Sequence, residues 1–372
     1  MGNEINSGIR GGVVEDPVIL EDMQDIYDRD MEWERLRNKT VLITGAYGML
    51  ASYLVFFLVY LNRYHGMNIS IIALGRNEGK AKAVFKGFFD DKAFTFRTDN
   101  ILEPIKDMPP ADYIVHAASL ARPDYYAKSP VEVAEPNALG TYYLLQYAAE
   151  VSCEAFLYFS SGDIYGKITS AACITEDMAG CVNPLDVHSC YGESKRMAET
   201  WCKAFYLEHQ VPVRIARIGH TYSPTMDIDN DSRVFAAFMK NVVEQKDIVM
   251  LSDGSSKRPF CYIADAIAAY LLLLLKGKDG EAYNVCNTEQ FISIRQLAEI
   301  MAGLRPELGL RVICKQRRMD DAYVENHDNK ENRPVENKLR ELGWECHFDV
   351  REGFGRCLTY LNSLQTRRKD NV

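Results

Sequence analysis

Short apolar runs recur along the first two thirds of the chain and alternate with stretches of helical periodicity. Uninterrupted runs of this length are typical of parallel strands that are buried on both faces. They cover Thr40–Thr44, Ile69–Leu74, Ala93–Phe96, Tyr113–His116, Ala155–Phe159 and Val213–Arg217. The pattern therefore predicts an α/β fold built on a doubly wound parallel sheet. Beyond Tyr222 the pattern loosens, which predicts a smaller mixed α/β lobe.

This rhythm divides the chain into three parts. Residues 1–37 are acidic and irregular, and we expect them to form a flexible or loosely docked N-terminal extension. Residues 38–222 should form mainly the sheet domain, and residues 223–372 mainly the smaller lobe. Within that lobe, residues 259–286 should return to the sheet domain.

Three helices can be read from local patterns. The apolar runs Met49–Leu61 and Ala266–Leu275 are too short to cross a bilayer, so we expect both to be buried helices. Ser293 and Gln296 form a capping box ahead of another apolar run, which predicts a helix start there. Asp265, just before the second apolar run, reads as a residue of that helix's first turn.

Composition narrows the class of protein. With 372 residues, 47% hydrophobic and 26% charged, the chain has the make-up of a soluble globular protein. A formal net charge of −9 offers no basic field for nucleic acid. The ten cysteines form no CxxC pair and no zinc-like spacing, so we expect reduced thiols and no metal site. No signal-peptide pattern opens the sequence, and we expect a cytoplasmic protein without a membrane partner.

A glycine-rich turn follows the first predicted strand and opens the first apolar helix. It carries Gly45, Tyr47, Gly48 and Met49, with Ala51 at the position where a helix packs on a strand. Glycines let the backbone turn tightly and approach a pyrophosphate, and the helix N-terminus offers free N–H groups. The turn therefore predicts a dinucleotide site on a Rossmann sheet.

The ends of the next two strands bear on the type of dinucleotide. An acidic residue that would bind the ribose 2′-hydroxyl of NAD is missing after Leu74, where Arg76 stands instead. Arg76 fits a 2′-phosphate and tilts the prediction from NAD+ toward NADP+, although a solvated arginine explains it equally well. Asp99 and Asn100 close the third strand and are placed to meet the adenine amine.

A tyrosine and a lysine are spaced for proton transfer. Tyr191 and Lys195 are four residues apart, which puts them on one face of a helix. A phenol titrates near pH ~10, and a neighbouring cation favours its ionised form. Ser161 ends the fifth predicted strand, at the sheet edge where ligands bind, and could share a substrate hydroxyl with Tyr191.

Five ordered motifs resemble the extended short-chain dehydrogenase/reductases, specifically the nucleotide-sugar epimerase/dehydratase family. They are Gly45-x-x-Gly48-x-x-Ala51, His116–Ser119, Asn137–Thr141, Ser160–Gly166 and Tyr191-x-x-x-Lys195, within a resemblance that covers roughly residues 38–345. The resemblance implies a tightly bound NAD+ or NADP+ that oxidises the sugar of a nucleotide-diphosphate sugar, usually at C4. It also implies a homodimer paired through the helices at residues 137–151 and 192–209.

The resemblance assigns roles residue by residue. Ser161, Tyr191 and Lys195 would be the catalytic triad. Residues of the cofactor site would include Ala117, Ala118, Ser119 and Asn137, although a buried capping role explains Asn137 as well. Ser161, Gly162, His220 and Arg258 would contact the substrate. His220 stands where the family usually has asparagine, and Arg258 is placed to bind the diphosphate.

The closest resemblance is to UDP-glucuronate decarboxylases, through Cys190–Thr200 and the segment around Arg258. Those enzymes usually carry Thr-Ser-Glu where this chain has Ser161-Gly162-Asp163. Asp163 is therefore a candidate catalytic acid, although a turn carboxylate explains it equally well. Gly162 lacks the acid that a 4,6-dehydratase needs. A decarboxylase ranks first and an epimerase second, with a 4,6-dehydratase, an NADPH-dependent reductase and a non-catalytic nucleotide-binding relative as further alternatives.

Overall fold

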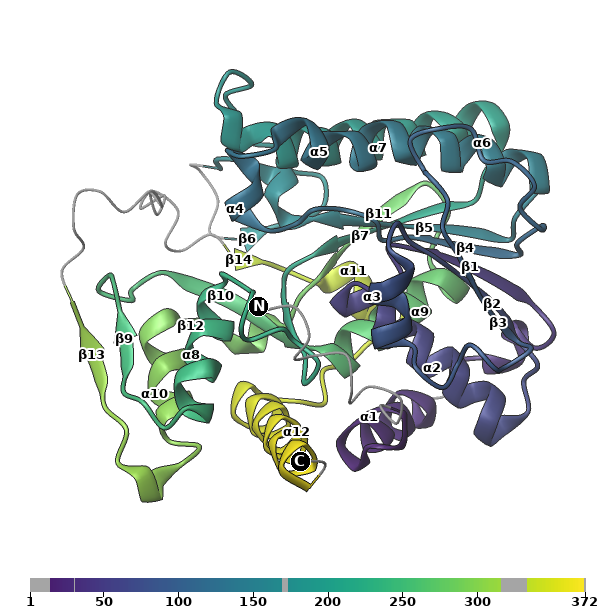
Figure 1. Cartoon of the computed structure of the whole chain (residues 1–372). Coiled ribbons are helices and arrows are strands. Elements are labelled where there is room, and N and C mark those ends of the chain that lie inside the picture. The colour runs from purple at the N-terminus through teal and green to yellow at the C-terminus, as the bar shows by residue number, and fades with distance from the viewer. Residues whose placement is uncertain (1–13, 30, 169–172, 316–332, 371–372) are drawn as a thin grey trace.

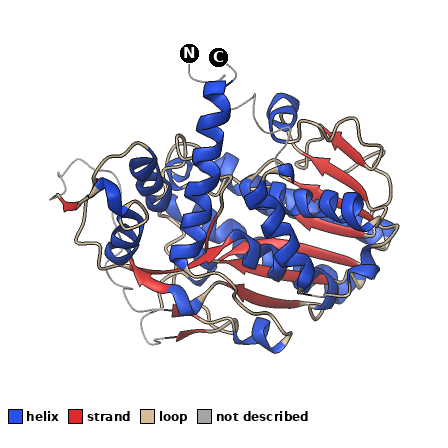
Figure 2. Cartoon of the chain, turned by 90° about the horizontal axis from the view of Figure 1, so that it is seen from below, coloured by secondary structure: helices blue, strands red, loops and turns tan. Residues whose placement is uncertain are grey.

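A seven-stranded parallel sheet forms the centre of the protein, in a computed structural model that describes residues 14–29, 31–168, 173–315 and 333–370. Its strand order is β11-β7-β5-β4-β1-β2-β3. In that order the strands span Glu281–Val285, Val213–Ile218, Ala155–Ser161, Tyr113–His116, Thr40–Thr44, Ser70–Leu74 and Phe94–Arg97. The order reverses direction between β1 and β4, as in a Rossmann sheet. The predicted doubly wound fold is confirmed, and Figure 2 shows its strands side by side.

Helices cover both faces of this sheet (Figure 1). One face carries α2 (Met49–His65), α3 (Glu78–Val84) and α9 (Ile263–Lys276). The other carries α5 (Pro130–Glu135), α6 (Thr141–Val151) and α7 (Cys190–His209), preceded by the short α4 (Pro123–Tyr126). Alternation along β1 separates the two cores, since Val41 and Ile43 pack toward α2 whereas Leu42 packs toward α6. The two apolar runs predicted as buried helices are α2 and α9.

The remaining elements form the smaller mixed lobe, on the left in Figure 1. Its helices are α8 (Val234–Val243) and α10 (Ile294–Ala302), and α10 begins with the predicted capping box. Its strands are β8 (His220–Tyr222), β9 (Ile248–Met250), β10 (Lys257–Tyr262), β12 (Phe291–Ser293) and β13 (Val312–Cys314), and β6 (Cys173–Ile174) pairs with β14 (Arg333–Pro334). Strand β10 continues directly into α9, so the chain returns to the sheet there. Helices α11 (Asn337–Glu341) and α12 (Val350–Asp370) follow.

The expectation of a loosely docked N-terminal arm is wrong for the part that the structure describes. Helix α1 (Pro17–Asp28) buries Ile19, Met23 and Ile26 completely. It packs against α2, α9 and α12, and Figure 1 shows it beside α12. Residues 1–13 and 30 of the predicted extension lie outside the described residues. An apolar helix face with three partners is part of the core.

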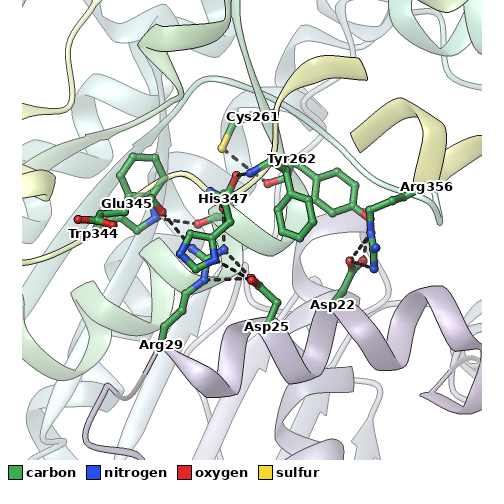
Figure 3. Close-up of polar contacts among 11 residues, drawn as sticks. Asp22, Asp25, Arg29, Cys261, Tyr262, Trp344, Glu345, His347 and Arg356 are labelled. Carbon is green, nitrogen blue, oxygen red and sulfur yellow. Dashed lines mark hydrogen bonds and ion pairs between the residues drawn. The ribbon is translucent and has the colours of Figure 1, made fainter. Parts of the chain in front are cut away.

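A buried carboxylate fixes α1 to three other elements. Asp22 accepts hydrogen bonds from Tyr262 Oη at 2.7 Å, from Arg356 Nε at 2.9 Å and from the Tyr53 hydroxyl. We call these four residues the Asp22 cluster, of which Figure 3 labels Asp22, Tyr262 and Arg356. Burial raises the pKa of Asp22 to about 6, although Arg356 and the two phenols act in the opposite direction. The cluster joins α1 to α2, β10 and α12.

A second contact fastens the end of α1. Arg29 Nη2 lies 2.6 Å from Asp25 and 2.7 Å from Asp265, which is in the first turn of α9 as predicted. The Asp265 carboxylate also accepts the backbone N–H groups of His347 at 2.9 Å and Phe348 at 3.2 Å. This carboxylate therefore connects α1 and α9 to the segment before α12 (Figure 3).

Two further observations concern thiols and membranes. All ten cysteines are free, and five of them are buried. Of the helices in the described ranges, none combines the length and the apolar character needed to span a bilayer.

Candidate functional site

The turn after β1 is shaped for close approach of a ligand. Gly45 has φ +62°, and a Cβ added there would lie 2.7 Å from Ala118 Cα. Thr44 Oγ1 accepts the N–H groups of Ala117 and Ala118 at 3.2 Å each, which joins the ends of β1 and β4. Gly48 caps α2 without a side-chain hydrogen bond, so the first N–H groups of a 17-residue helix are open. This backbone fits a dinucleotide pyrophosphate.

The residues predicted to hold the adenosine end lie at the tips of β2 and β3. The Tyr47 ring covers Gly75, where an added Cβ would lie 2.5 Å from the ring. Arg76 is exposed beside them, and no ion-pair partner is found for it among the described residues. Asp99 is paired with Arg97 at 2.7 Å. Arg76 is thus available to a phosphate, whereas Asp99 is already engaged by a cation.

Asn100 closes the local turn after β3. Its side-chain oxygen accepts the Leu102 N–H at 3.1 Å, and its amide donates to Glu103 at 3.1 Å. Its predicted contact with adenine stays a prediction.

The structure brings the predicted catalytic side chains together at the carboxyl end of β5. Ser161 is the last residue of that strand, and Tyr191 is the second residue of α7. Lys195, one helical turn later, is 2% exposed and donates from Nζ to the Phe159 carbonyl at 2.6 Å. Its Nζ lies 5.7 Å from the centroid of the Tyr191 ring.

Burial shifts the pKa values of Tyr191 and Lys195 in opposite directions. Burial, assisted by the Asp163 charge, raises the pKa of Tyr191 above its usual range, and the hydroxyls of Ser161 and Ser119 lower it less. Burial also lowers the pKa of Lys195 to about 7. The expectation that a neighbouring ammonium favours the phenolate therefore does not hold for the protein alone, because desolvation is the larger effect.

One buried oxygen atom at this site, Asn137 Oδ1, has no hydrogen-bond partner among the described residues. Asn137 lies in a π-helical turn, Pro136–Gly140, and its amide nitrogen donates to the Val133 carbonyl at 2.9 Å and to Ser194 Oγ at 3.0 Å. The amide nitrogen of Asn137 thus has a structural role, as the alternative explanation of this residue predicted. Its side-chain oxygen has no partner in the described part of the chain. Unpaired buried acceptors call for a ligand or a water, which fits the nicotinamide end of a dinucleotide.

Asp163, His220 and Arg258 come from three separate segments, and the Arg258 charge acts on both of the other two. Asp163 follows β5, His220 begins β8, and Arg258 lies in β10, the neighbour of β8. The side chains of Asp163 and His220 are exposed in the protein alone. Burial raises the pKa of the Asp163 carboxyl, which Arg258 opposes. Burial, together with Arg258 and Arg233, lowers the pKa of His220 to about 3.

The turn after β5 is closed by Ser161. Its Oγ accepts the Asp163 N–H at 3.1 Å, and the Asp163 carboxylate is not the group that closes the turn. Gly162 sits between them, and a Cβ added there would meet only Ile218 O at 3.9 Å.

Sequence reasoning missed two residues of this site. Tyr126 of α4 stacks on the Tyr191 ring, with centroids 5.1 Å apart and an interplanar angle of 12°. Arg233, at the start of α8, is close enough for its charge to lower the pKa values of Tyr191 and His220. Neither residue belongs to a motif with a spacing, and only the packing of α4 and α8 over the sheet edge brings them here.

Known proteins are similar to this chain over most of its length. UDP-glucuronic acid decarboxylase 6 of Arabidopsis thaliana is 30% identical over 319 residues, covering 85% of this chain and 87% of the relative. UDP-glucuronic acid decarboxylase 1 of Danio rerio is 27% identical over 335 residues, covering 90% and 75%.

Solved structures share the fold. UDP-glucose 4-epimerase from Thermotoga maritima has a TM-score of 0.73 at 21% identity, covering 88% of this chain and 99% of that one. The dTDP-glucose 4,6-dehydratase of Streptomyces venezuelae, solved with NAD, has a TM-score of 0.72 at 21% identity, covering 88% and 98%.

The sequence model of the NAD-dependent epimerase/dehydratase family matches residues 41–286, well over half of the chain. This match confirms the resemblance inferred from the five motifs and the prediction of a nicotinamide dinucleotide as cofactor. The chain therefore belongs to the NAD-dependent epimerase/dehydratase family of enzymes.

Proposed function

We propose that the chain oxidises a nucleotide-diphosphate sugar at C4 and then decarboxylates it, with a UDP-glucuronate-like substrate. The observation that carries the proposal is the set of charged groups that act on one another at this site: Asp163 acts on Tyr191, and Arg258 acts on both Asp163 and His220. The relatives at about 30% identity, which are named UDP-glucuronic acid decarboxylases, support the same reaction.

Three side chains take part in the proposed oxidation step. A bound NAD or NADP supplies the hydride acceptor and a positive charge beside Tyr191. Tyr191 takes the proton of the C4 hydroxyl, and Ser161 shares the hydrogen bond of that hydroxyl. Lys195 contributes an ammonium whose Nζ lies 5.7 Å from the centroid of the Tyr191 ring, where a positive charge would favour the ionised phenol.

The decarboxylation step needs a group that holds a carboxylate and one that returns a proton. Once C4 is a ketone, the C5–C6 bond breaks, its electrons pass toward the C4 oxygen and carbon dioxide leaves. Arg258 and His220 are placed to bind the anionic end of such a sugar, since a guanidinium matches carboxylate as well as phosphate geometry. Asp163, whose raised pKa favours its protonated form, is placed to protonate C5.

An epimerase is the second candidate, because Gly162 lacks a dehydratase acid and epimerisation does not require Asp163. To separate the reactions, the purified protein is incubated with UDP-glucuronate, UDP-glucose, dTDP-glucose and GDP-mannose, and the products are weighed. Loss of carbon dioxide from UDP-glucuronate supports the proposal. Unchanged mass with altered stereochemistry, or loss of water, contradicts it.

We also propose a homodimer through the layer formed by α6 and α7. The two helices pack against each other, α7 exposes Met197 (38%) and Leu207 (63%), and the turn before α6 exposes Leu139 (48%). Exposed apolar side chains on neighbouring elements are available to a protein partner. Sedimentation equilibrium should give twice the chain mass, and Leu207→Glu should reduce it toward the monomer.

A further inference from the structure

Glu199 lies behind the candidate catalytic side chains. It is one turn beyond Lys195 on α7, so the two side chains share a face of the helix. Arg217 donates to the Glu199 carboxylate from Nη2 at 2.7 Å and from Nε at 3.1 Å, and Ser160 Oγ donates at 2.5 Å. The side chains of Glu199 and Arg217 are 12% and 11% exposed. The carboxylate is therefore fixed in one orientation.

These contacts connect α7 to the end of β5. Ser160 pairs with Arg217 across β5 and β7, and it is the residue before Ser161. Phe159, the residue before Ser160, accepts the Lys195 ammonium at 2.6 Å. Lys195 and Glu199 thus hold successive residues of the strand whose last residue is Ser161.

Glu199 is also the anion that faces Lys195. The groups around the ammonium are the Tyr158 ring of β5 at 4.8 Å, the Tyr191 ring, Cys202 and Glu199 of α7, and His116 of β4. Burial keeps both phenols and the thiol neutral by raising their pKa values, and it keeps the imidazole neutral by lowering its pKa to about 3. Of these facing groups, Glu199 carries the negative charge. It raises the pKa of Lys195 against the effect of burial.

We propose that Glu199 is a positioning residue that keeps the Lys195 ammonium protonated and holds the end of β5 that presents Ser161. Arg217 binds the Glu199 carboxylate and holds it in place inside the protein. The proposal deepens the proposed function and rests on it for the roles of Lys195 and Ser161. Its electrostatic half concerns the protein alone and can be tested without substrate.

The direct test follows the charge of Lys195 in the protein without cofactor. Lysines are labelled with ¹³C at Cε, and the Lys195 resonance is assigned by its absence in Lys195→Arg. We expect a titration midpoint near pH 7 in the unchanged chain. In Glu199→Gln the midpoint should fall by about one pH unit, because the opposing charge is gone. An unchanged or higher midpoint overturns the proposal.

Two matched variants separate charge from structure. Ser160→Ala removes one hydrogen bond to Glu199 but keeps every charge, so its midpoint should stay within about 0.3 pH unit. Glu199→Asp keeps the negative charge, so its Lys195 midpoint should lie at least halfway from the Glu199→Gln value back to that of the unchanged chain. This variant also tests the proposal if Glu199→Gln does not fold. A Ser160→Ala shift as large as that of Glu199→Gln contradicts the charge mechanism.

Turnover gives an independent reading. Because Lys195 loses its proton at lower pH in Glu199→Gln, the alkaline limb of the kcat/KM profile should move down by the same amount as the midpoint. If the alkaline limb of the kcat/KM profile stays in place while the Lys195 titration midpoint moves, the proposed effect of Glu199 on catalysis is wrong. If no nucleotide sugar is turned over at all, the proposed function fails, while the titration still decides whether Glu199 controls Lys195.

Discussion

Two buried polar regions of this protein differ in how completely their groups are paired. In the Asp22 cluster, the carboxylate accepts hydrogen bonds from two tyrosines and one arginine. At the Tyr191 site, Asn137 Oδ1 is buried without a partner among the described residues. The pKa values of Tyr191 and Lys195 are also displaced by desolvation.

The difference indicates what each region is for. A cluster whose members satisfy one another stabilises the fold, and its removal should reduce stability. A site that keeps an open acceptor and displaced pKa values is typical of a functional site, since these groups are satisfied by a ligand. Stability and activity should therefore respond to different substitutions.

The largest effect is expected for Tyr191→Phe. Loss of the phenolic hydroxyl removes the proposed proton acceptor, so kcat should fall by about 10²–10⁴-fold. The free energy of unfolding should change by no more than about 1 kcal/mol, because the ring and its stacking with Tyr126 remain. Product formation and urea denaturation measure the two quantities. Near-normal turnover would remove Tyr191 from the mechanism.

Asp22→Ala should show the opposite behaviour. Two buried hydroxyls and the Arg356 guanidinium lose their acceptor, so the free energy of unfolding should fall by about 3 kcal/mol. At 20 °C the folded fraction should still turn over at a normal rate per folded molecule. Glu21→Ala is the matched control, because Glu21 pairs with the same Arg356 at 3.0 Å but is 67% exposed, and it should cost less than about 1 kcal/mol. If the two variants lose the same free energy of unfolding, burial is not what makes Asp22 more stabilising than Glu21.

The Asp22 cluster should also respond to pH. Because the pKa of Asp22 is raised to about 6, the folded chain holds a proton at pH 4–6 that the unfolded chain has released. The contribution of Asp22 to stability is therefore fully present below about pH 4 and is lost as the pH rises to about 6, by about 2–3 kcal/mol. Asp22→Asn should remove this dependence. Urea midpoints of both chains across that range measure the difference, and parallel curves would refute it.

The smallest effect concerns the cofactor. Arg76→Ala should weaken NADP+ binding by about 10-fold and leave NAD+ binding unchanged, because only NADP+ offers a 2′-phosphate to the guanidinium. Titration calorimetry with each dinucleotide gives both affinities. Equal affinities of the unchanged chain for the two dinucleotides would show that Arg76 is a solvated arginine.

The N-terminal region shows why sequence reasoning failed in one place. The Asp16 cap, Pro17 and the spacing of Ile19, Met23 and Ile26 were available as a helix signal. Acidic composition favours an exposed arm and points the other way. Two of the three helices that α1 packs against, α9 and α12, lie hundreds of residues away, so its docking could not be read locally.

The sequence by itself determined six of the seven strands of the sheet and the main reactive groups, whereas the edge strand β11 was not among the predicted runs. Apolar runs place the strands, since β1 and β4 have their predicted bounds, and motif order places Gly45, Ser161, Tyr191 and Lys195 at the carboxyl edge. Local patterns suffice here because periodicity and turn chemistry act between near neighbours. Only the tertiary structure decided that Tyr126 and Arg233 face Tyr191, that Asp163 meets His220 and Arg258, and that Asp22 is buried. Those contacts join segments distant in sequence, and their pKa shifts come from burial, which no local pattern encodes.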